Sequence, residues 1–137
     1  MKKFALVFLF LLVFVLSSCR YSDYLLAKKM LEKYSNDQNY VELSGEIIES
    51  NKNTVVIKCT ELKNYRSSPD EICTYYIYSN QILDLASGDH INFVTVPFHF
   101  YNGHKFPIVE LTIDGNTLLE FEEGKENLIE WVKLTFM

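Results

Sequence analysis

The sequence lacks the short motifs that mark several large enzyme classes. It contains no His-Glu-x-x-His, no Gly-x-Ser-x-Gly and no glycine-rich phosphate loop, so nothing local points to a zinc protease, a serine hydrolase or a nucleotide-binding enzyme. It also contains no internal repeat and no low-complexity run, which excludes a solenoid. We therefore expect a single globular unit with no enzymatic activity and no cofactor.

Positive charge is scarce. The chain has 13 lysines and arginines against 18 aspartates and glutamates, a net charge of −5. Residues 1–18 contain Lys2 and Lys3 and no acid, so the rest of the chain carries −7. A general nucleic-acid binder needs a positive field, and a polybasic membrane patch needs clustered lysines. The composition argues against both.

No charge interrupts residues 4–16, an apolar run of 13 residues that follows Lys2 and Lys3. A basic head, an apolar run and small residues in this order are typical of a bacterial secretory signal. The run is shorter than the roughly 20 residues of a membrane-spanning helix. We therefore favour an export signal over an uncleaved transmembrane anchor.

The signal ends in Leu16-Ser17-Ser18-Cys19, which resembles the lipobox of bacterial lipoproteins. That resemblance implies that residues 1–18 are a cleaved signal peptide and that Cys19 becomes the lipidated first residue, with a palmitate-type acyl anchor. The protein would then lie in the cell envelope, outside the cytoplasm. A cleaved signal without lipid remains the alternative.

Removal of residues 1–18 leaves 119 residues, enough for one modest core. We expect residues 19–39 to form a lipidated tether and then a helix, capped by Ser22 or Asp23. Residues 40–137 then form one domain.

The hydrophobic period changes to two at Tyr40 and predicts strands over 41–47, 54–60 and 72–79. Gly45 inside the first strand predicts a bend or bulge. We expect a short helix over 81–86, a long hairpin over 90–113, a short strand over 117–121 and a C-terminal helix after Gly124.

Asn102-Gly103 predicts a two-residue type I′ turn, which fixes the register of the long hairpin. The predicted cross-strand pairs are Val94 with Leu111, Val96 with Val109, His99 with Phe106, and Tyr101 with His104.

Three strands, a short helix and a long hairpin, in this order, resemble an OB-fold, a small closed antiparallel barrel. The element order is similar to that of the tRNA-anticodon-binding-like OB modules found in exported proteins. We therefore expect a mainly β (α+β) fold, an OB-fold-like five-stranded barrel with flanking N- and C-terminal helices. An open α+β sheet covered by helices is the alternative.

Cys59 and Cys73 are the two cysteines outside the signal. Export to an oxidising compartment favours a disulfide between them. Antiparallel pairing of their strands would bring them together, and two unpaired core thiols are the alternative.

The OB resemblance implies a ligand face on the second and third strands, the turn after the first strand and the tip of the long hairpin. On this chain that face carries Lys52, Lys58, Tyr76, Tyr78, Tyr101 and Lys105. The candidate partner-binding residues are Lys58, Tyr76, Tyr78, His99, Tyr101, His104 and Phe106. An exposed aromatic tip suits a protein interface. We expect a non-enzymatic binding or adaptor module for an envelope protein or peptide, of which an inhibitor or immunity lipoprotein is one type.

Two other functions stay open. Tyr76, Tyr78 and Lys58 could stack on and attract an oligosaccharide or oligonucleotide. Alternatively, His99 and His104, with an acid such as Glu110, could hold zinc in a metal-dependent hydrolase.

Overall fold

The computed structural model of the protein describes residues 2–62, 71–97 and 105–137. The elements, in chain order, are α1 (Lys2–Ser35), a 3-10 turn (Asp37–Asn39), β1 (Val41–Asn51), β2 (Thr54–Leu62), β3 (Ile72–Ile77), β4 (His90–Thr95), β5 (Lys105–Ile113), β6 (Asn116–Leu119) and α2 (Phe121–Phe136).

Five strands close into a barrel. β1 pairs antiparallel with both β2 and β4, β2 pairs with β3, and β4 pairs with β5. The ring closes where β3 and β5 run parallel, with Tyr75 opposite Phe106 and Ile77 opposite Ile108. The resulting order, β1-β2-β3-β5-β4, is that of an OB-fold. The predicted fold class is confirmed, although the closing pair is parallel, and β6 adds a further strand beside β5.

The barrel interior is filled by alternate side chains of every strand. Among the largest fully buried ones are Ile47, Ile57, Ile77, Phe93, Ile108 and Leu111. The pairing of β1 with β2 shifts between Ser44 and Gly45, which confirms the predicted bulge. A methyl group at Gly45 would lie 2.8 Å from the carbonyl oxygen of Lys58, so the two strands approach too closely there for a larger residue.

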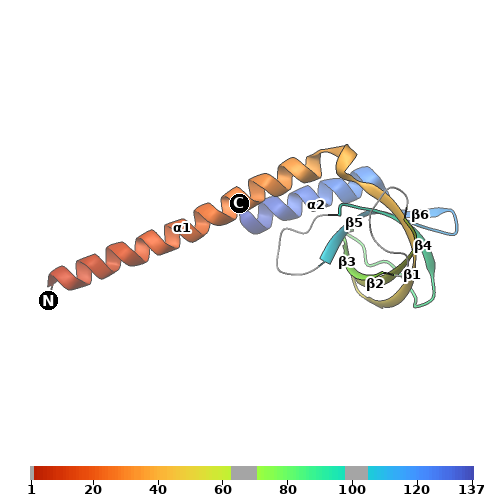
Figure 1. Ribbon diagram of the computed structural model, residues 1–137, viewed down its shortest axis with the longest axis horizontal. Coiled ribbons are helices and arrows are strands. Elements are labelled where there is room, and N and C mark those ends of the chain that lie inside the picture. The colour runs from red at the N-terminus through yellow and green to blue at the C-terminus, as the bar shows by residue number, and fades with distance from the viewer. Residues whose placement is uncertain (1, 63–70, 98–104) are drawn as a thin grey trace.

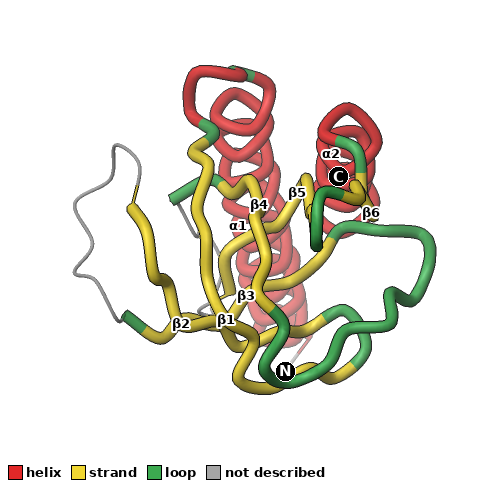
Figure 2. The backbone as a smooth tube through the Cα atoms, turned by 90° about the vertical axis from the view of Figure 1, so that its right-hand side faces the viewer, coloured by secondary structure: helices red, strands yellow, loops and turns green. Residues whose placement is uncertain are grey.

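The two helices cover one side of the barrel (Figure 2) and build a second core outside it. Its buried members are Ala27, Met30 and Tyr34 of α1, Leu128 and Val132 of α2, and Val96 and Val109 of the long hairpin. α2 crosses β5 at close range, because a methyl group at Gly124 would lie 2.6 Å from Cα of Val109. The barrel and the helix pair are therefore held together by a closely packed apolar interface.

The predicted register of the long hairpin is wrong by one residue. Phe93 lies opposite Leu111, and Val94 lies opposite Glu110. A shift between Val94 and Thr95 then brings Thr95 opposite Ile108, so Val96 does not face Val109 as predicted. The prediction failed because both faces of this hairpin are apolar. Phe93 fills the barrel, whereas Val94 packs toward the helices.

The predicted helix over 81–86 is also absent, and the segment between β3 and β4 is irregular. The Ser79 hydroxyl oxygen accepts a hydrogen bond from the Gln81 amide at 3.1 Å, and Asp89 accepts one from the Ala86 amide at 2.9 Å. These side-chain bonds satisfy backbone groups locally, which favours turns over a helix. Leu83 and Leu85 pack against the barrel core.

α1 is one continuous helix of 34 residues, where the sequence predicted a signal, a tether and a helix starting near Ser22. No glycine or proline interrupts residues 2–35, so nothing in the chain breaks the helix. Its first half projects away from the barrel (Figure 1) and is exposed. Within the described ranges, α1 alone is long and apolar enough to cross a membrane, a test that signal sequences also pass.

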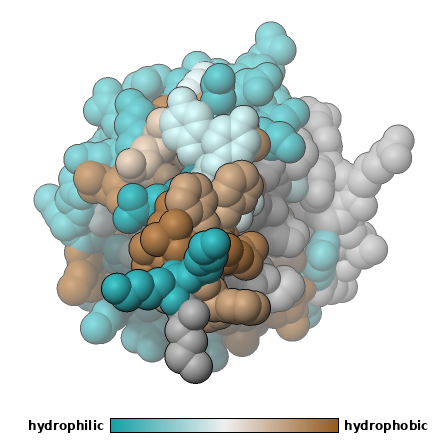
Figure 3. Space-filling view, turned by 90° about the vertical axis from the view of Figure 1, so that its left-hand side faces the viewer, coloured by the Kyte–Doolittle hydropathy of each residue, from teal (hydrophilic) through white to brown (hydrophobic). Residues whose placement is uncertain are grey.

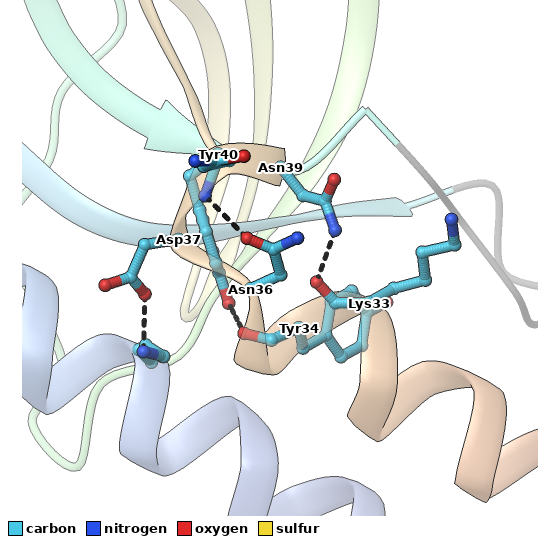
Figure 4. A network of polar contacts seen from close by, with 8 residues as sticks. Lys33, Tyr34, Asn36, Asp37, Asn39 and Tyr40 are labelled. Atoms are coloured by element: carbon cyan, nitrogen blue, oxygen red, sulfur yellow. Dashed lines mark hydrogen bonds and ion pairs between the residues drawn. The ribbon is translucent and has the colours of Figure 1, made fainter.

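The end of α1 is tied to the barrel by polar contacts (Figure 4). The Tyr40 hydroxyl donates to the Tyr34 carbonyl at 2.6 Å, and the Asn39 amide donates to the Lys33 carbonyl at 2.9 Å. These bonds satisfy carbonyls that the helix end would otherwise leave unpaired. Lys125 of α2 forms an ion pair with Asp37. The helix pair is thereby fixed at its barrel end.

Candidate functional site

The buried core between the helix pair and the barrel is formed by α1, α2 and the long hairpin of β4 and β5. The outer face of β2 and β3 lies away from this core. Three cross-strand pairs make up this face: Thr54 with Tyr76, Val56 with Thr74, and Lys58 with Ile72. Ile72 is 59% exposed, and the others in these pairs are half-buried. The face is therefore available for contact and carries apolar, aromatic and basic groups.

A pocket of about 460 Å³ adjoins this face at the turn between β1 and β2. It is lined by Asn51, Lys52, Asn53, Thr54, Tyr76 and Ile82. Ile82, in the irregular segment after β3, is 76% exposed. An aromatic ring and a branched aliphatic side chain thus share one hollow with a rim of amide and hydroxyl groups.

The pocket is held in shape by the turn itself. Asn53 accepts a hydrogen bond from the Ile77 amide at 2.7 Å through its carbonyl oxygen, and its side-chain amide donates to the Ser79 carbonyl at 3.4 Å. Lys52 adopts a positive φ of 55°, the left-handed conformation that lets the chain reverse in two residues. The turn is therefore bound to the end of β3 and is preformed.

Of the predicted ligand residues, Tyr76 and Lys58 lie on this face, and Tyr78, whose ring contacts that of Tyr76 at 5.0 Å, lies at its edge toward α2. The Tyr78 ring packs edge-on against Trp131 of α2, with ring centroids 5.6 Å apart. Its carbonyl accepts a hydrogen bond from the Asn127 side chain at 3.0 Å, and burial raises the pKa of its hydroxyl. Tyr78 therefore joins the barrel to α2.

Phe106 turns into the barrel and contacts Tyr75, with ring centroids 5.8 Å apart. It therefore lies away from the ligand face on which the hairpin register had placed it. The other predicted tip residues, His99, Tyr101 and His104, lie outside the described residues. Lys105 is exposed at the start of β5, opposite Thr74 of β3.

The predicted disulfide is not formed, and Cys59 and Cys73 are free thiols. Their strands are antiparallel neighbours as predicted, but Cys73 lies opposite Ile57 and the Cys59 amide bonds to Glu71. The two cysteines are therefore diagonal, a longer separation than direct opposition gives. The Cys59 sulfur instead lies 3.6 Å from the Tyr75 hydroxyl. Burial raises the pKa of Cys73 to about 11, so its thiol is protonated and weakly nucleophilic at neutral pH.

The described residues contain no group of three or more histidine, cysteine, aspartate or glutamate side chains that could hold a metal. Glu110, the acid considered for a zinc site with His99 and His104, is half-buried on β5 opposite Val94, and the two histidines lie outside the described residues. Burial, and then the carboxylates of Glu42 and Glu120, raise the pKa of Glu110.

This environment makes stability depend on pH in a definite direction. Because the pKa of Glu110 is higher in the folded state, the folded state binds more protons, and stability falls as pH rises above about 4.3, the ordinary glutamate value. We expect Glu110→Gln to raise the melting temperature at pH 7 and to leave it nearly unchanged at pH 4. Melting curves across this range test it, with exposed Glu49→Gln as the control. An equal gain at both pH values would contradict the assignment.

The sequence did not identify Asn51, Asn53 or Ile82 as site residues. The turn after the first strand and Lys52 had been predicted on the ligand face, and both border the pocket, but the flanking asparagines were not singled out. Ile82 was hidden by the predicted helix over 81–86, which placed it on a regular element. The pocket forms because that segment is irregular and returns beside the turn.

No protein-family model and no curated protein matches this chain. Three solved structures that resemble it are forms of CusF: an Ag(I) form, an apo form of the Escherichia coli protein and a Cu(II) form of an E. coli variant. Identities are 13%, 13% and 12%, and the TM-scores are 0.41, 0.42 and 0.43. The matches cover 55%, 55% and 58% of this chain and 97%, 87% and 96% of the CusF chains.

Proposed function

We propose that this protein is a non-enzymatic binding module, anchored at the outer side of a bacterial membrane, that binds an envelope protein or peptide through its β2–β3 face. The observation that carries the proposal is the preformed pocket lined by Tyr76 and Ile82. An apolar centre within a polar rim is the usual anatomy of a protein interface. An inserted apolar or aromatic side chain of the partner would occupy the pocket.

Charge narrows the class of partner. The mature chain carries −7, and none of the described residues that line the pocket is an aspartate or glutamate. A nucleic acid would be repelled by the overall field, whereas a protein with a basic surface would be attracted to it and could place an apolar residue between Tyr76 and Ile82, with Lys52 as the one charged side chain among the described lining residues. An inhibitor or immunity-type role fits this arrangement, because such proteins act by binding alone.

The anchor is proposed from the N-terminal residues. Apolar side chains of α1 stand free of the domain, with Phe4 86% and Phe14 76% exposed, so this run belongs in a membrane or in the export machinery. The sequence at 16–19 supports lipidation of Cys19. Labelled palmitate should mark the wild-type protein, and Cys19→Ser should lose both the label and the membrane fraction.

The partner site is tested by a photo-crosslinking amino acid at position 82 of the full chain in its native host. We expect one defined protein adduct, reduced at least about tenfold by Tyr76→Ala because the pocket loses its aromatic wall. The matched control places the same group at Leu118, which is 41% exposed on β6 and does not line the pocket. Equal adducts from both positions, or an adduct indifferent to Tyr76→Ala, would count against the proposed site.

A further inference from the structure

The last turn of α2 and the C-cap residue Met137 carry exposed apolar side chains. Leu134 is 79% and Met137 is 60% exposed, and Tyr21, on the neighbouring part of α1, is 65% exposed. Figure 3 views the molecule from the end from which α1 projects, so the exposed apolar run of α1 points toward the viewer. The helix pair therefore buries one apolar face of each helix and leaves other apolar side chains exposed at the end away from the barrel.

This end lies close to the proposed anchor. The C-terminus lies beside the middle of α1 (Figure 1), and Ala27 and Val132 belong to the same buried cluster. Counting five residues from this cluster toward the open end of the two antiparallel helices places Met137, the C-cap residue of α2, near Ser22 of α1. At about 1.5 Å per residue, the tip of α2 is about 5 Å along the helix axis from Cys19. The headgroup layer of a bilayer is roughly 5–8 Å thick on each side, so an anchored Cys19 brings this tip to the membrane surface.

The distribution of charged residues also favours contact between this end and a membrane. Residues 20–29 and 130–137, which we name the juxtamembrane end, contain four basic residues (Arg20, Lys28, Lys29, Lys133) and two acidic ones (Asp23, Glu130). The rest of the mature chain contains seven basic and sixteen acidic residues. The net charge is thus +2 for the juxtamembrane end and −9 for the rest of the mature chain. An anionic membrane attracts the first and repels the second.

We propose that the juxtamembrane end docks on the anionic surface of the membrane that holds the N-terminus, with Leu134 and Met137 inserted among the headgroups. The inference rests on the proposed membrane attachment and adds a second contact to it. Tyrosine is enriched at this depth, which suits Tyr21. Trp131 links the tip to the barrel, because its ring contacts Phe136 at 5.7 Å and Tyr78 at 5.6 Å. The membrane would then hold the protein at two points, the N-terminal anchor and the tip of α2. Two points of attachment fix the orientation of the barrel relative to the membrane.

The test uses the full chain in phosphatidylcholine vesicles that contain phosphatidylglycerol. Trp131, the only tryptophan, is changed to phenylalanine, and a reporter is introduced as Leu134→Trp or, as the matched control, Ile82→Trp. A lipid nitroxide near the headgroup should quench the reporter at 134 at least about twofold and leave the reporter at 82 unchanged. In vesicles without phosphatidylglycerol, the lipid nitroxide should quench the reporter at position 134 less strongly.

The outcomes separate the two proposals. Chains that fail to float with the vesicles overturn the attachment and the docking together. Chains that float while neither reporter is quenched overturn the docking alone. Protection of position 134 from aqueous iodide without quenching by the lipid places a second protein copy there and also overturns it. Hydrogen exchange of residues 130–137 in the wild-type chain needs no substitution and should slow when vesicles are added.

Discussion

Gly124→Ala is expected to lower the free energy of unfolding by about 3 kcal/mol, the upper part of the range for overpacking a buried contact. The added methyl group would lie 2.6 Å from Cα of Val109 and closer still to its carbonyl group. These are backbone atoms of a central strand, so they move only if α2 lifts away from β5. In a helix with space around it, the same change stabilises by up to about 1 kcal/mol. The sign of the effect therefore tests the helix–barrel contact.

Urea unfolding of the full chain in mild detergent measures this free energy. Trp131 reports on the same contact, because its ring packs against Tyr78 of the barrel, and its emission should shift to longer wavelength if α2 detaches. Glu126→Ala, at an exposed position two residues further along α2, is the control and should change little. A stabilised Gly124→Ala protein would show that α2 does not cross β5 as described.

Phe93→Ala is expected to cost about 3–5 kcal/mol, the range for removing a buried phenylalanine ring. Phe93 is 1% exposed, and its ring meets that of Tyr75 edge-on with centroids 5.0 Å apart. The neighbouring Val94→Ala removes fewer atoms from a half-buried site between the hairpin and the helices, so we expect a loss of about 1 kcal/mol.

This pair of variants decides between two registers of the long hairpin. In the structure Phe93 lies opposite Leu111 inside the barrel, whereas the turn at Asn102-Gly103 had predicted Val94 in that place. Urea midpoints of the two single variants give the comparison directly. A larger loss from Val94→Ala than from Phe93→Ala would favour the register predicted from the turn.

The barrel was predictable because most of its strands alternate cleanly. β2 and β3 each turn one apolar row inward, and Gly45 announced the bend in β1. The long hairpin was not predictable at the level of single residues, because Val94, Val96 and Val109 face a second core that only the helices create. Local alternation does not distinguish two apolar faces that are both buried.

The candidate site was predictable only in part, for a related reason. Lys58 and Tyr76 follow from their place on β2 and β3. Tyr78 lies two residues after Tyr76, so a regular strand would place both on the same face. The Tyr78 ring packs against Trp131 of α2, and α2 lies more than forty residues later in the sequence. Ile82 depends on an irregular segment whose shape is set by side-chain bonds from Ser79 and Asp89. Such contacts leave no periodic pattern.

The parallel closure of the barrel has a consequence for how the newly made chain folds. β3 cannot complete its pairing until β5 has been synthesised, because Thr74 pairs with Lys105, about thirty residues later in the chain. Pairing across such separations is slow, commonly milliseconds to seconds. Throughout that interval Ile-Cys-Thr-Tyr-Tyr-Ile, the whole of β3, is an uncharged edge without proline or glycine, the kind of segment that recruits identical strands from other molecules. During biogenesis this strand is therefore the place where aggregation begins if folding is delayed.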